Sequence, residues 1–261
     1  MQAFDFIIVG AGSSGCVLAN RLTENGQHKV LLIEAGGSDR RFWIRTPIGY
    51  GMTFFDRSVN WCFEGEKDPG LNDREIYVPR GKVIGGSSSI NAMVYCRGAK
   101  GDFDDWRDAG NPGWGWDDVK PAFDAIERHV RKDGSVEGNG PLTVSDRQQD
   151  YHPLKRHFIG AARDAGLPLA DGTAGQGDEG FGPYLINTRD GLRCSSADAF
   201  LHPIKHRPNL TILTEAHVTK ILFDGKRAVG VSYRRDGIMQ DARATREVIL
   251  SAGAIQSPQL L

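Results

Sequence analysis

The sequence lacks long apolar runs, paired cysteines and an excess of charge of either sign. A membrane-spanning helix needs about 20 consecutive apolar residues, and the 261 residues contain no such run. The formal net charge is −1 at pH 7, so no overall field favours nucleic acid as a partner. The four cysteines are scattered without a C-x-x-C pair, which predicts reduced thiols and no metal site. Peripheral association with a membrane stays open.

The two ends of the sequence give two further expectations. No basic and apolar leader precedes the first apolar stretch, which predicts a cytoplasmic protein. The segment 251–261 is apolar and uncharged and is typical of a strand end, a turn and the start of a helix. A domain that ended there would expose apolar surface. We therefore expect the chain to be truncated, as part of a longer protein.

A glycine pattern near the N-terminus is the clearest motif. The apolar stretch 6–9 leads into Gly10, Gly12 and Gly15 with G-x-G-x-x-G spacing, and a helical segment follows. In a strand–turn–helix unit the first glycine allows the tight turn, the second lets phosphate approach and the third lets helix and strand pack. The helix start, with Ser13 and Ser14, then offers N–H groups to a pyrophosphate.

A carboxylate lies where this motif requires one. The apolar segment 29–33 predicts a second strand, and Glu34 and Ala35 follow it. Glu34 comes about 20 residues after the last glycine, where a carboxylate contacts ribose in dinucleotide-binding folds. The pattern therefore predicts a dinucleotide and leaves NAD and FAD open. A glycine turn with a purely structural role is the alternative.

A second small-residue stretch runs from Gly81 to Asn91. Two adjacent glycines and three serines would let backbone approach a flat or anionic ligand. The alternative is a flexible linker, but linkers lack apolar anchors such as Val83, Ile90 and Met93.

The remaining patterns predict an α/β fold with mixed sheets. Val119, Phe123, Ile126 and Val130 share one face of an amphipathic helix, and a second helix is expected over 153–165. In that second helix Leu154 and Phe158 are expected to point inward, together with Ala161, Ala162 and Ala165. Strands are expected at 209–214, 216–223, 228–233 and 246–250.

Two long motifs resemble the signatures of the glucose–methanol–choline (GMC) oxidoreductase family. The segment from Gly81 to Asn91, followed by Tyr95, Gly98 and Asp104, is similar to the first signature. The segment 253–261 is similar to the first part of the second signature. The residues of the first motif are most similar to those of the choline and alcohol dehydrogenase branch of this family. The sequence is thus identified as resembling the N-terminal part of such a protein.

This resemblance implies a Rossmann-like FAD-binding domain and part of a substrate-binding domain. The implied ranges are 1–140 for the first part of the FAD-binding domain, 141–208 for a substrate-side insertion and 209–261 for the continuation. Many members oxidise a primary alcohol to an aldehyde and pass electrons to oxygen or a quinone. The implied partners are therefore a small-molecule alcohol and one of these acceptors.

The resemblance also implies which residues contact FAD. The loop Gly10–Gly15 would hold the pyrophosphate, Glu34 the adenosine ribose and the Val218 backbone the adenine, while Ala252 and Gly253 would close over the ADP half. Along the isoalloxazine and its linker it places Val83, Ser87, Asn91, Ala92, Met93 and Val94. Ile90 stands where some members carry a histidine bonded to flavin, so dissociable FAD is expected.

No catalytic residue is assigned within this chain. The family uses a histidine near its C-terminus, and none of the seven histidines here matches that motif. The chain alone is therefore expected to be inactive. Three alternatives are a nicotinamide dehydrogenase, a hydroxynitrile-lyase-like relative that needs flavin without redox chemistry, and a non-catalytic FAD-binding fragment.

Overall fold

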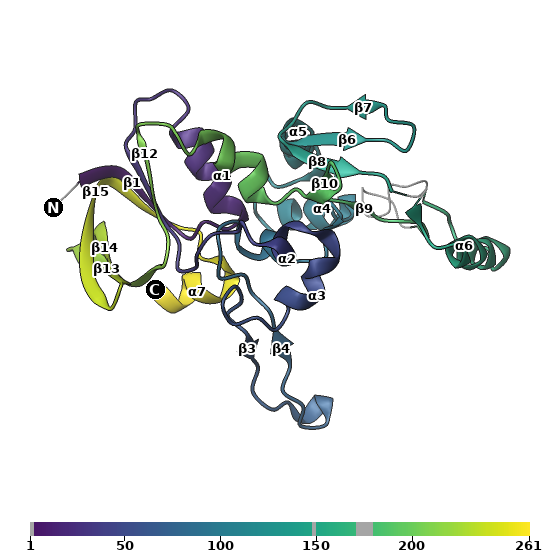
Figure 1. Cartoon of the computed structure of the whole chain (residues 1–261), viewed down its shortest axis with the longest axis horizontal. Helices are drawn as coiled ribbons and strands as arrows, with labels where there is room; N and C mark the ends of the chain where they lie inside the picture. The colour runs from purple at the N-terminus through teal and green to yellow at the C-terminus, as the bar shows by residue number, and fades with distance from the viewer. Residues whose placement is uncertain (1–2, 148–149, 171–179) are drawn as a thin grey trace. The chain divides into compact units, whose positions relative to one another are not determined.

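The computed structural model describes residues 3–147, 150–170 and 180–261. The chain forms two compact units: unit 1 holds Met1–Ala92 and Ser195–Leu261, and unit 2 holds Met93–Cys194 (Figure 1). The expected domain boundaries lay at residues 140 and 208, so unit 2 both begins and ends earlier than the expected insertion. The assignment of an FAD-binding and a substrate-binding domain to these parts stays a prediction.

Unit 1 is built on a six-stranded mixed sheet with the order β12-β2-β1-β15-β14-β13. Its strands are β1 (Ala3–Val9), β2 (Val30–Ile33), β12 (Leu210–Leu213), β13 (Ala216–Asp224), β14 (Arg227–Arg235) and β15 (Ile238–Leu250). β1 pairs in parallel with β2 and β15, and β12 pairs in parallel with β2. β13, β14 and β15 pair antiparallel. The expected mixed α/β architecture is confirmed.

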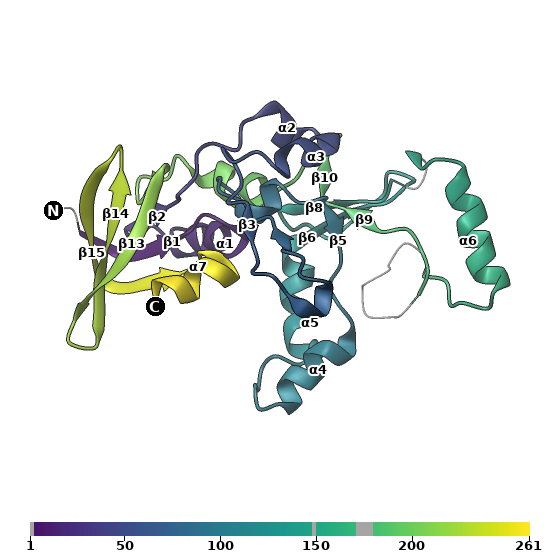
Figure 2. The same ribbon diagram turned by 90° about the horizontal axis from the view of Figure 1, so that it is seen from below.

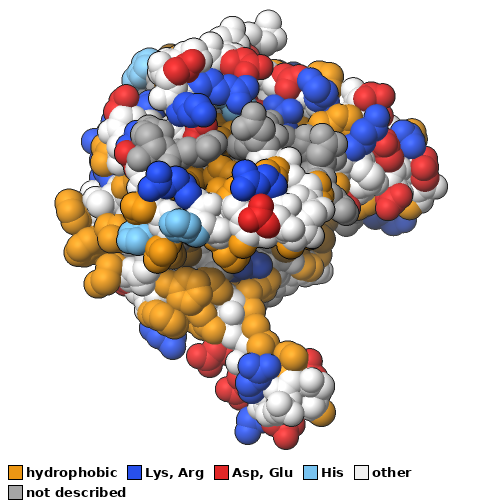
Figure 3. Space-filling model, turned by 90° about the vertical axis from the view of Figure 1, so that its right-hand side faces the viewer, with side chains coloured by type: hydrophobic (Ala, Val, Ile, Leu, Met, Phe, Trp, Pro, Cys, Tyr) orange, Lys and Arg blue, Asp and Glu red, His pale blue; other side chains and the backbone are white. Residues whose placement is uncertain are grey.

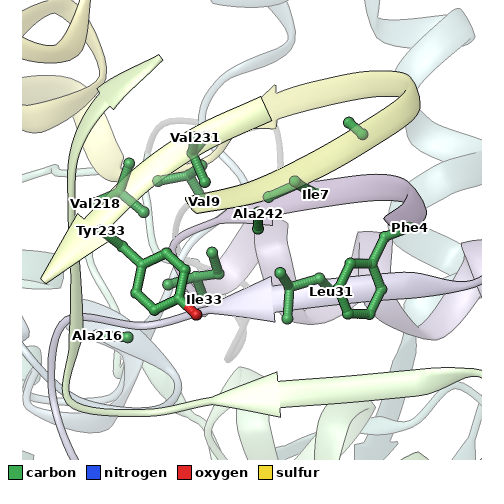
Figure 4. Packing of buried hydrophobic residues seen from close by; sticks show 11 residues of the cluster. Phe4, Ile7, Val9, Leu31, Ile33, Ala216, Val218, Val231, Tyr233 and Ala242 are labelled. Carbon is green, nitrogen blue, oxygen red and sulfur yellow. The ribbon is translucent and has the colours of Figure 1, made fainter. Parts of the chain in front are cut away.

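The two central parallel strands are apolar on both faces because both faces are covered. Helix α1 (Ser13–Leu22) packs near β1 and β2 and buries Cys16 and Ala19. On the other face, alternate residues of β1 and β2 form one cluster with side chains from β13, β14 and β15 (Figure 4). That cluster contains Phe4, Ile7, Val9, Leu31, Ile33, Ala216, Val218, Val231, Tyr233, Ala242 and Ala244.

Two tight hairpins explain why the last strand is longer than the sequence pattern suggested. Gly225 has φ +58° in the two-residue turn between β13 and β14. Asp236 and Gly237 have φ +51° and +76° between β14 and β15, the geometry of a type I′ turn. The strand expected over 246–250 therefore begins at Ile238, directly after this Asp-Gly turn.

The other elements of unit 1 are short. They are α2 (Phe42–Arg45), η1 (Pro47–Gly49), α3 (Tyr50–Thr53), β3 (Phe63–Glu64), η2 (Pro69–Leu71), β4 (Tyr77–Val78), η3 (Gly86–Ser89), η5 (Ala197–Leu201), η6 (His202–Ile204) and α7 (Gly253–Leu260). The β3–β4 hairpin projects from the rest of unit 1, and its tip is covered by charged side chains (Figures 1 and 3). Figure 3 also shows apolar side chains open to solvent. Among the described residues of unit 1, Phe42, Ile48 and Phe55 are highly exposed apolar side chains.

Unit 2 contains a five-stranded sheet with the order β5-β9-β8-β6-β7. Four of these strands, β5, β6, β8 and β9, are labelled in Figure 2. Its elements are β5 (Val94–Tyr95), α4 (Lys100–Asp108), α5 (Trp116–Ile126), β6 (Glu127–Val130), β7 (Val136–Glu137), β8 (Leu142–Ser145), α6 (Leu154–Asp164), β9 (Leu185–Ile186), β10 (Thr188–Arg189) and β11 (Leu192–Arg193). No helix in the described ranges is long and apolar enough to cross a membrane.

Two details of the expected helices in unit 2 are wrong. Val130 lies in β6, because α5 ends at Ile126 and the chain pairs with β8 from Glu127 onward. The buried Glu127 carboxylate accepts hydrogen bonds from Tyr95 and Arg97, which holds the chain extended there. In α6 the expected helix is confirmed, but of the five residues expected to point inward only Ala162 is buried, and Leu154, Phe158, Ala161 and Ala165 are exposed.

Candidate functional site

A cavity of about 810 Å³ lies in unit 1 at the carboxyl ends of β1, β2 and β15. Segments far apart in the chain line it, within 9–14, 33–35, 80–87, 216–219 and 250–260. Ligands of open α/β sheets bind outside the carboxyl ends of the parallel strands. The cavity therefore occupies the place where this fold binds a ligand.

The glycines of the first loop are required by close backbone contacts. Gly10 has φ +96°, and a Cβ there would lie 2.6 Å from the carbonyl oxygen of Ser251. A Cβ on Gly15 would lie 1.9 Å from the carbonyl oxygen of Gly10. The Ser251 hydroxyl lies within donating distance of two carbonyl oxygens, 3.0 Å from that of Val9 and 2.9 Å from that of Gly10. The end of β15 thus holds this loop in its turn.

The start of α1 is open toward a ligand. No side-chain hydrogen bond caps this helix, and Ser13 and Ser14 are exposed and line the cavity. The first N–H groups of a helix have no partner within the helix, and the helix dipole places partial positive charge there. These residues therefore suit the phosphate groups of a dinucleotide.

Glu34 lines the same cavity and is almost completely buried. Its Oε2 accepts from the N–H of Ala11 at 2.8 Å, and its Oε1 accepts from the N–H of Gly36 at 2.9 Å. Burial raises the pKa of this carboxyl, although these backbone hydrogen bonds oppose the rise. Each carboxylate oxygen has a second acceptor position. Glu34 can therefore hold the loop and also accept from a ribose hydroxyl.

The second glycine stretch packs directly on the first. The N–H of Gly85 donates to the carbonyl of Ala11 at 2.7 Å. Gly86 has φ +56°, and a Cβ there would lie 2.8 Å from the Cα of Gly12. Ser87 lines the cavity, and its Oγ accepts from the N–H of Gly81 at 3.1 Å. The two motifs found in the sequence thus form one wall of one site.

The structure brings most of the expected cofactor residues together at this cavity. Those that line it are Gly10, Gly12, Ser13, Ser14, Glu34, Ala35, Ser87, Val218, Ala252 and Gly253. Gly15 packs behind the loop, and the Val83 side chain is buried in a cluster with Ile44, Val59 and Ile90. Asn91 and Ala92 are exposed parts of unit 1 outside the lining, and Met93 and Val94 belong to unit 2. Contact of these last residues with isoalloxazine stays a prediction.

Several lining residues were not expected from the sequence, among them Trp61, Arg80, His217 and Gln256. The rings of Trp61 and His217 lie 5.4 Å apart between centroids. Partial burial lowers the pKa of His217, and the positive charges of Arg234 and Lys82 lower it further. His217 directly precedes Val218, so its place beside the site could have been inferred from that neighbour alone. No local pattern marked Trp61 or Arg80.

Known proteins resemble the chain along its whole length. It is 46% identical over 266 residues to mitochondrial choline dehydrogenase of Mus musculus, covering 99% of this chain and 44% of that protein. It is 45% identical to alcohol dehydrogenase [acceptor] of Pseudomonas putida, covering 99% of this chain and 47% of that protein. The chain therefore spans about half the length of these relatives.

Solved structures agree with this relationship. Pyridoxine 4-oxidase from Mesorbium loti superimposes with a TM-score of 0.91 at 38% identity, over 98% of this chain and 51% of that one. An FAD-dependent oxidoreductase from Chaetomium thermophilum gives a TM-score of 0.88 at 35% identity, over 99% of this chain and 47% of that one. A family profile described as GMC oxidoreductase matches residues 4–261. The chain therefore belongs to the GMC oxidoreductase family.

Proposed function

We propose that the protein is an FAD-dependent oxidoreductase that oxidises the CH–OH group of a primary alcohol to an aldehyde. The observation that carries this proposal is the cavity in which the start of α1, the Ser87 hydroxyl and the Glu34 carboxylate converge. Family membership and the FAD-dependent structural neighbour imply FAD rather than a nicotinamide. Bound FAD would supply a hydride acceptor at its N5.

The residues of the cavity would bind and orient the cofactor. The N–H groups at Gly12–Ser14 and the Ser87 hydroxyl would donate to the pyrophosphate. Glu34 would accept from the adenosine ribose, and the Val218 backbone would contact adenine. Ala252 and Gly253, where α7 begins, would close over the ADP half. We place the catalytic histidine beyond Leu261, because removal of the hydroxyl proton needs a base and no histidine here matches the family motif.

We infer that FAD is not covalently attached. Ile90 stands where some family members carry a flavin-bonded histidine, and its side chain is buried in the cluster with Val83. An isoleucine side chain has no nucleophilic atom. Denaturation of the flavin-loaded protein is expected to release all of the flavin to the supernatant, and flavin retained by the precipitated chain would contradict this.

The names of relatives suggest the substrate class. Two relatives are named choline dehydrogenase and alcohol dehydrogenase [acceptor], and others are named oxygen-dependent choline dehydrogenase. We therefore propose a choline-like, aliphatic or aromatic alcohol, with oxygen or a quinone as the acceptor. A cytoplasmic location stays a prediction, since the choline dehydrogenases of Mus musculus and Homo sapiens are named as mitochondrial.

Two measurements test the proposal. The visible spectrum of the chain mixed with FAD should show the shifted peaks of bound oxidised flavin. The second measurement uses a chimera in which the sequence of a relative follows Leu261. With choline or simple alcohols as substrates this chimera should reduce a dye acceptor, whereas the 261-residue chain alone should not. A hydroxynitrile-lyase-like protein would leave the flavin oxidised. Alcohol turnover by the chain alone would contradict the placement of the base.

A further inference from the structure

One cationic side chain lines the cavity without a carboxylate partner. Among the described lining residues Arg80 is the one lysine or arginine and Glu34 the one acidic residue. No ion pair in the described ranges involves Arg80, and the hydrogen bond of its side chain there runs from Nη1 to the carbonyl of Pro79 at 2.7 Å. A guanidinium has five N–H donors in a planar fork. Arg80 therefore has donors to offer to an anion in the cavity.

The backbone of Arg80 is held in place by a buried amide. The Asn60 side chain is 1% exposed, and its Oδ1 accepts from the N–H of Arg80 and from the N–H of Cys62, each at 3.0 Å. The N–H of Trp61 donates to the carbonyl of Arg80 at 2.9 Å. Arg80 thus has an exposed side chain on a fixed backbone, which differs from an arginine in a free surface loop.

The residue after Arg80 connects it to the anion-binding end of α1. A Cβ on Gly81 would lie 2.2 Å from the carbonyl carbon of Gly86, and Gly86 lies against Gly12. The Gly81 N–H also donates to the Ser87 Oγ, so the hydrogen of that hydroxyl is available to a ligand. Arg80 therefore begins a segment whose next members already touch the phosphate-binding loop.

We propose that Arg80 binds the pyrophosphate of the cofactor, together with the N–H groups at the start of α1 and the Ser87 hydroxyl. This inference rests on the proposed function, in which the cavity holds FAD. A pyrophosphate diester carries about two negative charges, and an arginine can bind its oxygens in bidentate fashion. Glu34, the acidic residue of the described lining, can contribute no positive charge. Arg80 thus supplies the positive charge that the ligand requires.

Binding measurements on the 261-residue chain test this assignment. FAD affinity is measured by flavin fluorescence, and the affinities of ADP and adenosine by calorimetry. Arg80→Ala should weaken FAD and ADP binding by about 10- to 100-fold, the effect of losing one hydrogen bond to a charged group. Adenosine binding should be unchanged, because adenosine carries no phosphate. Arg80→Lys should give an intermediate loss, and Arg80→Gln a loss close to that of alanine.

The control is Lys226→Ala, which removes one positive charge from the exposed turn between β13 and β14, outside the lining. It should leave all three affinities unchanged. If the unmodified chain bound neither FAD nor ADP, the proposed function itself would fail. If it bound both and Arg80→Ala bound FAD equally well, the assignment of Arg80 would be overturned. A parallel loss of adenosine affinity in the variant would overturn it too, since it would indicate a structural role.

Discussion

Gly15 is the residue whose replacement the glycine loop tolerates least. In Gly15→Ala the new Cβ would lie 1.9 Å from the carbonyl oxygen of Gly10, which is fixed backbone. We expect a loss of about 1–3 kcal/mol in the free energy of unfolding, and loss of FAD binding as the loop shifts. Chemical denaturation and flavin fluorescence measure the two effects.

The matched control for this change is Gly51→Ala in α3. A Cβ on Gly51 meets nothing within 4 Å, and alanine is the better helix former, so stability should be unchanged or slightly higher. Equal stability of the Gly15 and Gly51 variants would show that the loop can relax around a side chain.

Glu34 should make cofactor affinity depend on pH. Burial raises the pKa of its carboxyl above the ordinary 4.5, so the carboxyl binds a proton more readily in the folded, ligand-free protein than in the unfolded chain. The stability that this proton contributes is fully present below pH 4.5 and is lost as pH rises through the raised pKa. Ribose hydroxyls donate to the ionised form, so FAD affinity should rise with pH through the same interval.

Titrations of FAD between pH 4.5 and neutral pH measure this dependence. In Glu34→Gln the amide would set its NH₂ group against the N–H of either Ala11 or Gly36, each of which now donates to a carboxylate oxygen. This variant should bind FAD weakly at every pH, and its affinity should lack the rise. Tighter binding by the unmodified chain at low pH would contradict the assignment of Glu34 to the ribose.

Some residues of the site could be predicted from the sequence, and others could not. Gly10, Gly12 and Glu34 were predictable because their roles follow from spacing within one strand–turn–helix–strand unit. Arg80 was not, because its place depends on two backbone hydrogen bonds with residues about 20 positions away in the chain: its N–H donates to Asn60, and its carbonyl accepts from the N–H of Trp61. Sequence spacing carries no signal of such a contact.

At the scale of elements, the sequence predicted those that are stabilised by their own pattern. β1, α1 and β2 follow from apolar runs around the glycine loop. The end of α5 was wrong because Val130 continues the helical spacing while the buried Glu127 begins a strand. The first part of β15 shows little alternation of apolar and polar residues, and its pairing with β14 stabilises it as a strand. Periodicity does not report such pairing.

The hairpin between β14 and β15 should depend on the glycine of its Asp-Gly turn. Gly237 has φ +76° with open space around it, so a side chain there meets strain but no clash. Gly237→Ala should cost about 1–2 kcal/mol of unfolding free energy, and Gly237→Asn less, since asparagine tolerates this conformation better. Thermal and chemical unfolding measure both.

A glycine in an ordinary helix serves as the comparison for Gly237. Gly160 lies inside α6, its φ is outside the left-handed region and no atom lies within 4 Å of its ideal Cβ. Gly160→Ala should therefore stabilise the protein by about 0.5–1 kcal/mol. Destabilisation by this change, or no effect of alanine at Gly237, would contradict the conformational argument.

At the scale of the whole molecule, one site is assembled from chain segments on both sides of an inserted unit. Unit 2 occupies Met93–Cys194, and the cavity is lined from before it, at 9–14, 33–35 and 80–87, and from after it, at 216–219 and 250–260. A ligand that fills the cavity should therefore slow hydrogen exchange in several separate segments of the sequence at the same ligand concentration. Filling it should also stabilise unit 1 by about 2.7 kcal/mol at a free ligand concentration 100 times Kd.

Hydrogen–deuterium exchange with and without FAD tests this assembly. Amides in the loop 10–15, in 81–87, in 216–219 and in 251–257 should all gain protection at the same FAD concentration, because they surround one cavity. The Gly225–Lys226 turn, which lies outside the lining, should keep its exchange rate. In Arg80→Ala the same segments should gain protection only at higher FAD concentration. Protection of the N-terminal loop without 216–219 and 251–257 would mean that β13 and α7 do not contribute to the site.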